Sequence, residues 1–353
     1  MQGLPQTSKP STTETDWPTL LHDNSRTGGQ EIRAAKAPNN VRWRVRMGSS
    51  VRSAPVLRAG VLYVTSMAGK LHAIDVELGR EEWQFQAPDH IHSTPSLSGN
   101  KVLFGCDSGE VHAVDRVSGT SLWKTSADAE VWSSPVIRDG EVFFGSADSR
   151  LYAVDIDTGR KHWTQELGGR IYSTACVEGR HLYVGCGDSK VYCLDVLSGK
   201  TVWSTATENG VDSSPALAGD TVLIGSEDFF FYALEAKTGA VRWKYETGLG
   251  ISSSPAVSED LVIVGSKDGF LYAFEIQSGR LRWRVKVSDA VTAPPVVGNG
   301  LVCIQAGGTQ ALDIASGNLV WRAGLGGAVQ SAPVLTGDAI YVASNDGEVY
   351  ALE

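Results

Sequence analysis

The sequence has no long apolar run, few sulfur-containing residues and no excess of positive charge. No window approaches the ~20 consecutive apolar residues of a transmembrane helix, so we expect no membrane span. The first residues, MQGLPQTSKPSTTETDW, lack the charged-then-apolar order of a secretory signal peptide. The formal net charge is −9, whereas proteins that bind a phosphate backbone cluster Lys and Arg, so we expect no nucleic-acid partner.

Tryptophan, in contrast, is abundant, since ten Trp accompany only three Met. Eight of the Trp recur at a period of 40 residues, shortened to 38 at the last step, and they are Trp43, Trp83, Trp123, Trp163, Trp203, Trp243, Trp283 and Trp321. From the second onward, each Trp ends a longer pattern, of which AVDIDTGRKHW at residues 153–163 is one copy. The chain therefore contains eight copies of one repeat.

Each unit contains four short apolar and β-branched runs separated by turn residues. In the unit at residues 253–287, the turns lie at Glu259-Asp260, Asp268-Gly269 and Ser278-Gly279. Four strands in ~40–45 residues are typical of one blade of a β-propeller. The sequence therefore predicts an all-β protein, an eight-bladed β-propeller of four-stranded antiparallel blades.

The two ends of the chain predict how the ring closes. The last unit stops at residues 348–353 without a fourth strand, and residues 42–47 carry the first Trp without a preceding turn motif. We therefore expect residues 42–47 to complete the last blade of a single, monomeric propeller domain over residues 17–353. Residues 1–16 are rich in Ser, Thr and Pro and are expected to form a flexible segment.

Proline marks the innermost strand of the predicted blades. A strand interior needs the N–H that Pro lacks, so we expect this strand to be an edge that faces the axial channel and contains the Pro. The prolines are Pro55, Pro95, Pro135, Pro215, Pro255, Pro295 and Pro333, with Ala175 in the fourth blade.

Other repeated positions are expected to belong to the scaffold. The indoles would wedge between blades, and the acidic residue eight positions before most of them would accept turn N–H groups. The five Cys replace small residues, and no two are adjacent, so we expect small buried residues rather than a disulfide framework. His72 and His112 stand where most other units have Tyr and are expected to be packing residues.

These motifs resemble the PQQ-like repeat proteins of the quinoprotein superfamily, in which A-x-D-x-x-x-G-x-x-x-W is known as the tryptophan-docking motif. The resemblance covers nearly the whole chain from about Trp17 onward, and DWPTLLHDNSRTG at residues 16–28 is similar to the segment before the first blade in that family. The superfamily includes PQQ-dependent dehydrogenases, an outer-membrane assembly lipoprotein and sensor domains. The resemblance therefore implies a periplasmic or extracellular location without implying one function.

One position of the repeat, the second residue of VWSSPV and its equivalents, varies freely between conserved neighbours. It holds Arg52, His92, Trp132, Tyr172, Asp212, Ser252, Thr292 and Gln330, and two residues earlier lie His90, Glu130 and Arg170. Because the innermost strands begin at one mouth of the channel, these side chains are expected to form a funnel that binds a ligand. The turns between the second and third strands open on the same face, where Phe229 and Phe230 are expected to form a partner surface.

No catalytic constellation accompanies these residues, so the sequence favours a non-catalytic binding or assembly scaffold over an enzyme. Its partner would be a protein or a small planar ligand at the channel mouth. One alternative is a minimal PQQ-dependent dehydrogenase, with PQQ and Ca²⁺ over the mouth, PQQ stacked on Trp132 and its carboxylates bound by Arg52 and Arg170. Another is an extracytoplasmic sensor domain of a larger protein.

We assign no cofactor and no metal from the sequence. The weaker alternative is a metal held by His90 and His92, which lie on one side of an extended segment, with Glu130 as the third ligand.

Overall fold

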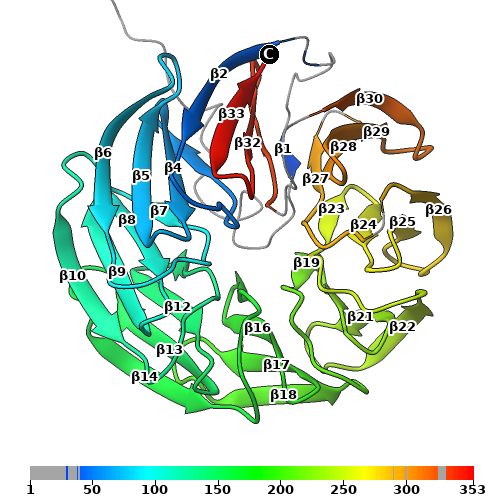
Figure 1. The fold of residues 1–353 in the computed structure, drawn as a ribbon. Helices are drawn as coiled ribbons and strands as arrows, with labels where there is room; N and C mark the ends of the chain where they lie inside the picture. The colour runs from blue at the N-terminus through cyan, green and yellow to red at the C-terminus, as the bar shows by residue number, and fades with distance from the viewer. Residues whose placement is uncertain (1–28, 31–37, 39, 289, 299, 325–330) are drawn as a thin grey trace, which may run out of the picture.

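The computed structural model describes residues 29–30, 38, 40–288, 290–298, 300–324 and 331–353. Within these residues the strands form eight sheets, arranged radially around a central axis (Figure 1). Each sheet is one blade, and we number the blades in chain order and letter the strands of each blade A to D from the axis outward. The predicted eight-bladed, all-β fold is confirmed.

The strands of the blades are as follows. Blade 1 contains β3 (Val56–Arg58), β4 (Val61–Ser66), β5 (Lys70–Asp75) and β6 (Arg80–Gln86), and blade 2 contains β7 (Ser96–Ser98), β8 (Lys101–Gly105), β9 (Glu110–Asp115) and β10 (Ser121–Ser126). Blade 3 contains β11 (Val136–Arg138), β12 (Glu141–Gly145), β13 (Arg150–Asp155) and β14 (Lys161–Glu166), and blade 4 contains β15 (Cys176–Glu178), β16 (His181–Cys186), β17 (Lys190–Asp195) and β18 (Thr201–Ala206). Blade 5 contains β19 (Ala216–Ala218), β20 (Thr221–Gly225), β21 (Phe230–Glu235) and β22 (Val241–Glu246), and blade 6 contains β23 (Ala256–Ser258), β24 (Leu261–Gly265), β25 (Phe270–Glu275) and β26 (Leu281–Lys286). Blade 7 contains β27 (Val296–Gly298), β28 (Leu301–Gln305), β29 (Thr309–Asp313) and β30 (Leu319–Ala323), and blade 8 contains β31 (Val334–Leu335), β32 (Ile340–Ala343) and β33 (Glu348–Leu352).

The D strand of blade 8 comes from the other end of the chain. Strand β2 (Val41–Arg46) pairs antiparallel with β33, with Trp43 opposite Ala351. The predicted closure of the last blade by an N-terminal strand is thus confirmed, one residue earlier than expected. The segment predicted to be flexible, residues 1–16, and the family-like segment at residues 16–28 lie outside the described residues.

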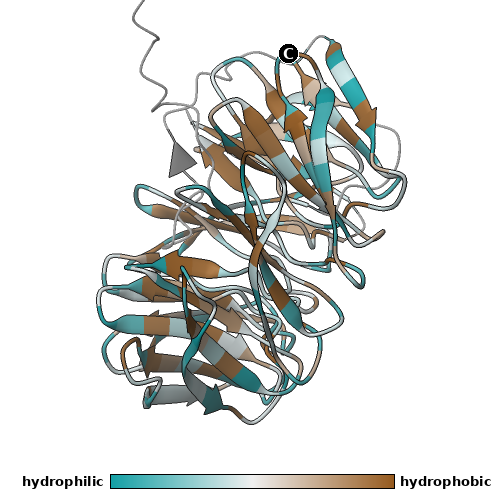
Figure 2. Cartoon of the chain, turned by 90° about the vertical axis from the view of Figure 1, so that its left-hand side faces the viewer, coloured by the Kyte–Doolittle hydropathy of each residue, from teal (hydrophilic) through white to brown (hydrophobic). Residues whose placement is uncertain are grey.

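The hydrophobic core lies between the blades rather than within any one of them. Strands B and C are buried along nearly their whole length, whereas D strands such as β14 expose alternate residues. Hydrophobic stretches therefore lie along the strands with hydrophilic residues between them (Figure 2). The blades approach so closely that a Cβ on Gly105, at the end of β8, would lie 2.3 Å from Val131 Cγ1 in the segment that leads into blade 3. All five Cys are buried thiols, as predicted.

Each indole links its own blade to the next one. Seven of the eight repeat Trp residues donate their Nε1–H to a backbone carbonyl of the following blade at 2.7–3.2 Å, as Trp203 does to Ala236 at 2.9 Å. The ring lies against the turn glycine of that blade, since a Cβ on Gly239 would lie 2.5 Å from Trp203 Cε3. The exception is Trp321, whose buried Nε1 has no hydrogen-bond partner within the described part of the chain. It faces blade 8, whose C and D strands are not joined by a turn because β2 supplies the D strand.

The acidic turn residues act as predicted. Asp115 accepts a hydrogen bond from the Ser118 backbone N–H at 2.8 Å, and Asp155 accepts one from Thr158 at 2.8 Å. Where the acidic residue is Glu, the side-chain hydroxyl of the Ser or Thr in the turn donates the hydrogen bond instead, as Ser278 does to Glu275 at 2.7 Å.

The prolines lie just outside the strands in which they were expected. Each one immediately precedes its A strand, as Pro135 precedes β11, because the ladder hydrogen bonds begin only at the next residue. The A strands are inner edges, as predicted, except in blade 7. There the two-residue strand β1 (Gly29–Gln30) pairs in parallel with β27 and covers its inner edge (Figure 1).

The residues before these prolines, with Thr174 before Ala175 in blade 4, form an arc of hydrogen bonds around the channel. Backbone N–H groups donate to the hydroxyl of the equivalent residue in the next blade at 2.9–3.1 Å, and the donors are Ala54, Thr94, Ser134, Thr174 and Ser214. The equivalent positions of blades 7, 8 and 1 hold Pro294, Ala332 and Ala54, which carry no hydroxyl. The arc therefore joins blades 1 to 6 and stops there.

The contrast between Trp203 and Trp321 gives a test of docking. We expect Trp203→Ala to lower the free energy of unfolding by about 3–5 kcal/mol, the range for a buried Trp. Trp203→Phe keeps most of the apolar contact and should cost about 1 kcal/mol more than Trp321→Phe, because only Trp203 loses a hydrogen bond. Urea unfolding of the variants measures the difference, and equal costs for the two Phe variants would contradict a role for the N–H bond.

Candidate functional site: the channel mouth

The segments that connect strand D of one blade to strand A of the next share one face with the B–C turns. Backbone hydrogen bonds hold them together, from Asp107 N to His90 O at 2.9 Å and from Glu227 N to Gly210 O at 3.0 Å. The predicted common face is therefore present, and we call it the channel mouth.

The variable position projects to this mouth because its neighbours are anchored. Val131 is fully buried against the preceding blade, and the hydroxyl of Ser133 donates to Gly145 O at 2.9 Å. The side chain between them, Trp132, is 37% exposed. Of the other residues predicted for this ring, Arg52 and Thr292 are exposed, His92, Tyr172, Asp212 and Ser252 are half-buried, and Gln330 lies outside the described residues.

Three of these side chains form a continuous aromatic row across blades 2 to 4. The His92 ring stacks on Trp132 with centroids 4.4 Å apart, and Trp132 stacks on Tyr172 at 4.5 Å. The Arg170 guanidinium lies 5.1 Å from the centroid of the Tyr172 ring and extends the row. We call His92, Trp132 and Tyr172 the aromatic row. Since both faces of Trp132 are covered, its exposed part is chiefly the edge of the indole.

Asp107, in the B–C turn of blade 2, fixes the row and was missed from the sequence. Its Oδ1 accepts the Trp132 Nε1–H at 2.8 Å, and its Oδ2 lies 3.6 Å from His92 Nε2. A signal was present, because the residue at this turn position also varies between blades, through Met67, Asp107, Ala147, Gly187, Glu227, Lys267 and Asn345. This turn position therefore lines the mouth together with the two positions that were predicted from the sequence.

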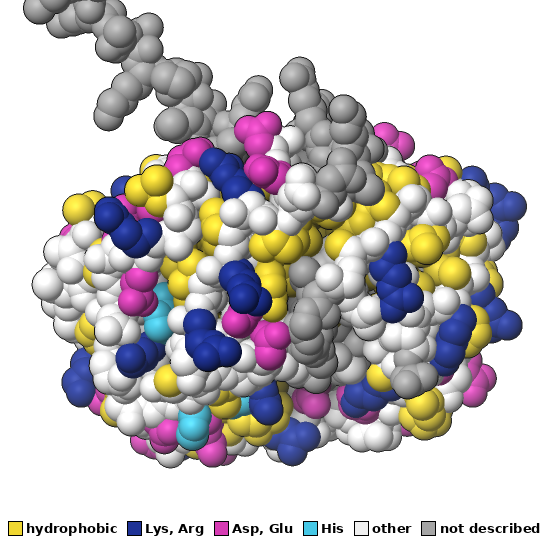
Figure 3. Space-filling model, turned by 45° about the horizontal axis from the view of Figure 1, so that its top comes forward, with side chains coloured by type: hydrophobic (Ala, Val, Ile, Leu, Met, Phe, Trp, Pro, Cys, Tyr) yellow, Lys and Arg dark blue, Asp and Glu magenta, His cyan; other side chains and the backbone are white. Residues whose placement is uncertain are grey.

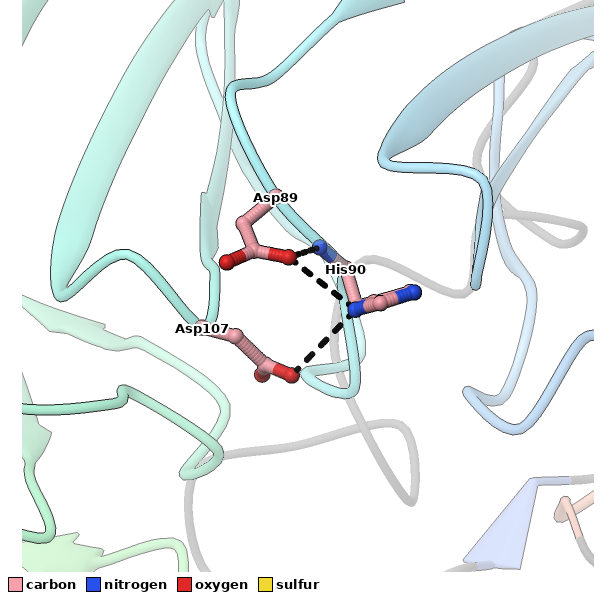
Figure 4. A group of neighbouring side chains, drawn as sticks. All are labelled: Asp89, His90 and Asp107. Carbon is pink, nitrogen blue, oxygen red and sulfur yellow. Dashed lines mark hydrogen bonds and ion pairs between the residues drawn. The ribbon is translucent and has the colours of Figure 1, made fainter.

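The metal-capable group in the described part of the chain differs from the predicted alternative. It comprises Asp89, His90 and Asp107, whose ligand atoms all lie within 4.8 Å of one another. In Figure 4 the two carboxylates approach the same nitrogen of His90, with Asp89 Oδ1 at 3.0 Å from Nδ1. Asp89 also accepts the His90 backbone N–H at 2.8 Å, so ordinary pairing accounts for its position. Neither His92 nor Glu130 belongs to this group.

The row continues into a charged cluster at blades 5 and 6. Arg170 lies 4.0 Å from Asp212, and Lys267 pairs with Glu227 at 2.6 Å. Burial raises the pKa of Asp212, partly offset by the positive charge of Arg170, and its Oδ1 has no hydrogen-bond partner among the described residues. A Cβ on Gly250 would lie 2.4 Å from Glu227 Oε2, so a larger residue there would have to shift the Glu227 side chain.

The remaining predicted residues contribute less to this arrangement. The charge of Arg52 lowers the pKa of His92 and that of Glu130 raises the pKa of Tyr172, although burial is the larger cause in both cases. No side-chain contact within the described residues joins Ser252 or Thr292 to the row. The face in Figure 3 interleaves Lys and Arg with Asp and Glu and carries no large patch of one sign.

Phe229 has an unusual backbone for an aromatic residue. It lies in the B–C turn of blade 5 with φ of 78°, where blades 1, 2 and 6 have Gly69, Gly109 and Gly269 at similar angles. A bulky residue in the left-handed region is strained, yet its side chain is 42% exposed and gains little from packing. Phe230 differs, being half-buried beneath Lys244, whose Nζ lies 3.9 Å from the ring centroid.

Comparison with known proteins agrees with this architecture. The sequence matches the family described as "Beta-alanine-activating enzyme, beta-propeller" over residues 138–353, more than half of the chain. The chain belongs to this propeller family. Residues 24–105 and 88–171 match a second family, described as "Outer membrane protein assembly factor BamB", which confirms the PQQ-like repeat type inferred from the docking motif. No curated protein matches the sequence.

Several solved structures share the fold of this PQQ-like propeller. BamB from Moraxella catarrhalis has 20% sequence identity and a TM-score of 0.76, covering 89% of this chain and 99% of its own. Quinohemoprotein alcohol dehydrogenase from Comamonas testosteroni has 16% identity and a TM-score of 0.82, covering 96% of this chain and 80% of its own. The computationally designed Ika8 protein has 17% identity and a TM-score of 0.78, covering 87% and 98%. At these identities the likeness establishes the fold alone.

The described part of the propeller contains no helix with the length and apolar character needed to cross a membrane.

Replacement of Trp132 tests whether the row stabilises the fold. Trp132→Ala should lower the free energy of unfolding by about 1–2 kcal/mol, the sum expected for two exposed aromatic contacts. The cost should stay well below that of Trp203→Ala, because Trp203 is only 9% exposed. Chemical denaturation of both variants gives the comparison, and a Trp132→Ala cost equal to that of Trp203→Ala would make Trp132 a structural residue.

Burial of imidazoles predicts a loss of stability at acid pH. Desolvation lowers the pKa of His92, and likewise of His72 and His112. The unfolded chain, with ordinary His pKa values of about 6.5, then binds more protons than the folded chain below that pH. The free energy of unfolding should fall as the pH drops below about 6.5 and level off below the folded-state pKa values. Urea midpoints across this range measure the slope, which His92→Gln should reduce, and a flat profile would contradict the assignment.

Proposed function

We propose that this protein is a non-catalytic scaffold whose channel mouth binds a segment of a partner protein. The observation that carries the proposal is the aromatic row, in which rings from three successive blades are packed together before any partner arrives. Side chains already held in place lose little conformational freedom on binding, so more of the contact energy appears as affinity. Trp, Tyr and Arg are also the types that most often dominate interface energetics.

The surroundings of the row suit a protein rather than a small planar molecule. Charged side chains at the edge, such as Arg170 and His90, are more than half exposed. An aromatic centre with a charged, solvated rim is the usual anatomy of a protein interface. Phe229 provides a second contact in blade 5, where its strained backbone holds an aromatic side chain in solvent. Strain of about 1–3 kcal/mol at an exposed residue is typical of binding sites.

The mouth does not fit PQQ stacked on Trp132. Both indole faces are already covered, by His92 at 4.4 Å and Tyr172 at 4.5 Å, so a stacked ligand would have to displace one of them. The contact between Arg170 and Tyr172 also holds this guanidinium over the row. The proposed function therefore assigns no role to PQQ.

We place the scaffold in the cell envelope or outside the cell. This follows from the similarity to BamB, whose family description names outer membrane protein assembly. It is a proposal by similarity, and it sets the compartment in which partners should be sought.

Photo-crosslinking in the native host tests the proposal. A photoreactive amino acid replaces Arg170 or Phe229 at the mouth, and Leu78 serves as the control because it is 65% exposed in a C–D turn on the opposite face. We expect one discrete protein adduct at both mouth positions, none at Leu78, and loss of the adduct when Trp132→Ala is added. The same adducts at Leu78, or none at either mouth position, would refute a docking role for the mouth.

A further inference from the structure

A second candidate surface lies on the outer side of the ring, on the D strands of blades 5 to 8. These strands, β22, β26, β30 and β2, follow one another along one half of the rim in Figure 1. Together they contain nine Lys or Arg and one acidic residue, whereas the D strands of blades 1 to 4 contain three of each. In a chain of net charge −9, positive charge is thus concentrated on one half of the rim.

The residue that follows each docking Trp shows the contrast most clearly. Neighbouring residues of a strand point to opposite sides, so this residue points away from the blade on which the indole docks. In blades 5 to 8 it is exposed and positively charged, as Lys244, Arg284, Arg322 and Arg44. In blades 1 to 4 it is Gln84, Lys124, Thr164 and Ser204. The one cation of this second set, Lys124, already pairs with Glu110 at 2.6 Å.

The cations of blades 5 to 8 fall into two groups. Those that precede the docking Trp bind carboxylates of the protein, as Arg242 binds Asp220 at 2.6 Å and Arg282 binds Glu275 at 2.7 Å. Those that follow it are less compensated. Within the described residues, Lys244, Arg284, Lys286 and Arg322 have no ion-pair partner, and Arg44 and Arg46 each lie 3.7 Å from Glu348. We call these last six residues the basic wall.

Aromatic rings support part of the basic wall without neutralising it. The Nζ atom of Lys244 lies 3.9 Å from the centroid of Phe230. The charged groups of Arg284 and Lys286 lie 5.3 Å and 5.2 Å from the centroid of Phe270. Such contacts order the long side chains and leave their charge available to a ligand, so less conformational freedom is lost on binding.

Protection of sheet edges does not account for this distribution of charge. Edge strands often carry Lys or Arg because these residues prevent pairing with strands of other molecules. Each D strand is the outer edge of its sheet, so all eight would need the same protection. Strand β18 of blade 4, TVWSTA, nevertheless contains no charged residue.

Apolar side chains accompany the cations on the same four blades. Two positions before the docking Trp, blades 5 to 8 hold Val241, Leu281, Leu319 and Val41, whereas blades 1 to 4 hold the polar residues Glu81, Ser121, Lys161 and Thr201. Three of the apolar residues are 47–56% exposed, and they are Val41, Val241 and Leu319. The surface therefore offers both positive charge and apolar contacts.

The shape and chemistry of this surface favour an acidic polypeptide as the ligand. The strands follow the curve of the rim, so a flat lipid surface would meet only part of them at a time, whereas an extended chain can follow all four. Carboxylates match the planar guanidinium groups of Arg284, Arg322 and Arg44. Apolar side chains of the same polypeptide can contact Val241 and Leu319.

We propose that the basic wall binds an extended segment of a partner protein that is rich in Asp and Glu and also carries apolar residues. At physiological ionic strength the Debye length is about 8 Å, so the nearby cations outweigh the net negative charge of the whole chain. This surface is independent of the scaffold function proposed for the mouth.

The test is fluorescence anisotropy of labelled peptides with the whole chain at low ionic strength. One peptide contains Glu, Ser and Leu, and the second has Lys in place of each Glu. We expect saturable binding of the acidic peptide, at least about tenfold tighter than that of the Lys peptide, and weaker binding as salt is added. No saturable binding of the acidic peptide, or equal binding of both peptides, would overturn the proposal.

Further probes separate an acidic polypeptide from other anionic ligands. They are an oligothymidylate with the same number of charges and vesicles that contain phosphatidylglycerol, the latter measured by co-sedimentation. Tighter binding of either probe than of the acidic peptide would reassign the surface to nucleic acid or lipid and overturn the choice of a protein. An acidic peptide with Ser in place of Leu should bind about threefold more weakly, and equal binding would refute the apolar contribution.

Two triple variants with the same net charge locate the surface. Lys244→Gln, Arg284→Gln and Lys286→Gln together remove three cations of the basic wall and should weaken the acidic peptide by about tenfold. Gln84→Glu, Thr164→Glu and Ser204→Glu add three negative charges on blades 1, 3 and 4, and should change the affinity by less than about twofold. Circular dichroism checks that both variants are folded. Equal weakening in the two would show a general effect of net charge and overturn the assignment.

Discussion

The contact of one indole with the turn glycine and carbonyl of the next blade is the interaction on which the ring depends. A single four-stranded sheet leaves both of its apolar faces exposed, so each blade is stable only between two others. The indole covers the junction at its outer end and uses its one N–H there, as Trp203 does at Ala236. The closing strand β2 therefore has two tasks. It completes the sheet of blade 8, and through Trp43 it docks blade 8 on Val76 of blade 1.

The mouth depends on this regularity. Val131 and its equivalents anchor each connector against the preceding blade, so residues 40 positions apart are brought to neighbouring points around the axis. His92, Trp132 and Tyr172 stack because the scaffold delivers them at one height in successive blades. The connectors and B–C turns are free to vary because neither carries the docking contacts. The ring itself therefore does not specify a function.

The repeat made most of the fold predictable, since each docking Trp, acidic turn and Pro recurs eight or nearly eight times. The exact ends of the strands were harder to predict. Pro135 was expected within its strand, yet the ladder begins one residue later at Val136, because a residue without N–H cannot open it. Strand β1 was not foreseen, because two residues in a parallel pair leave no periodic pattern.

The site was predictable in outline and not in its contacts. The free variation at Trp132 indicated the mouth, but whether its indole faces would be open depended on the rotamers of His92 and Tyr172. Asp107 was not predicted because it lies in a turn, and polar residues are common in turns whether or not they belong to a site. His112 was expected only to pack, and it is indeed buried, with its ring stacked on Phe104, but the contact of its Nε2 with Glu110 at 3.1 Å was not predicted.

The pairing of β2 with β33 also determines how the ring responds to mechanical load. The start of β2 lies beside the end of β33, where Asn40 and Glu353 exchange two backbone hydrogen bonds at 3.1 Å. A pull on both ends of the propeller would strain this outermost pair first, and the strands would then peel apart one pair at a time instead of sliding past each other with all bonds loaded together. Under tension the ring would therefore open at blade 8, where the two strands are held only by their pairing. Every other pair of neighbouring blades is also joined by the polypeptide chain.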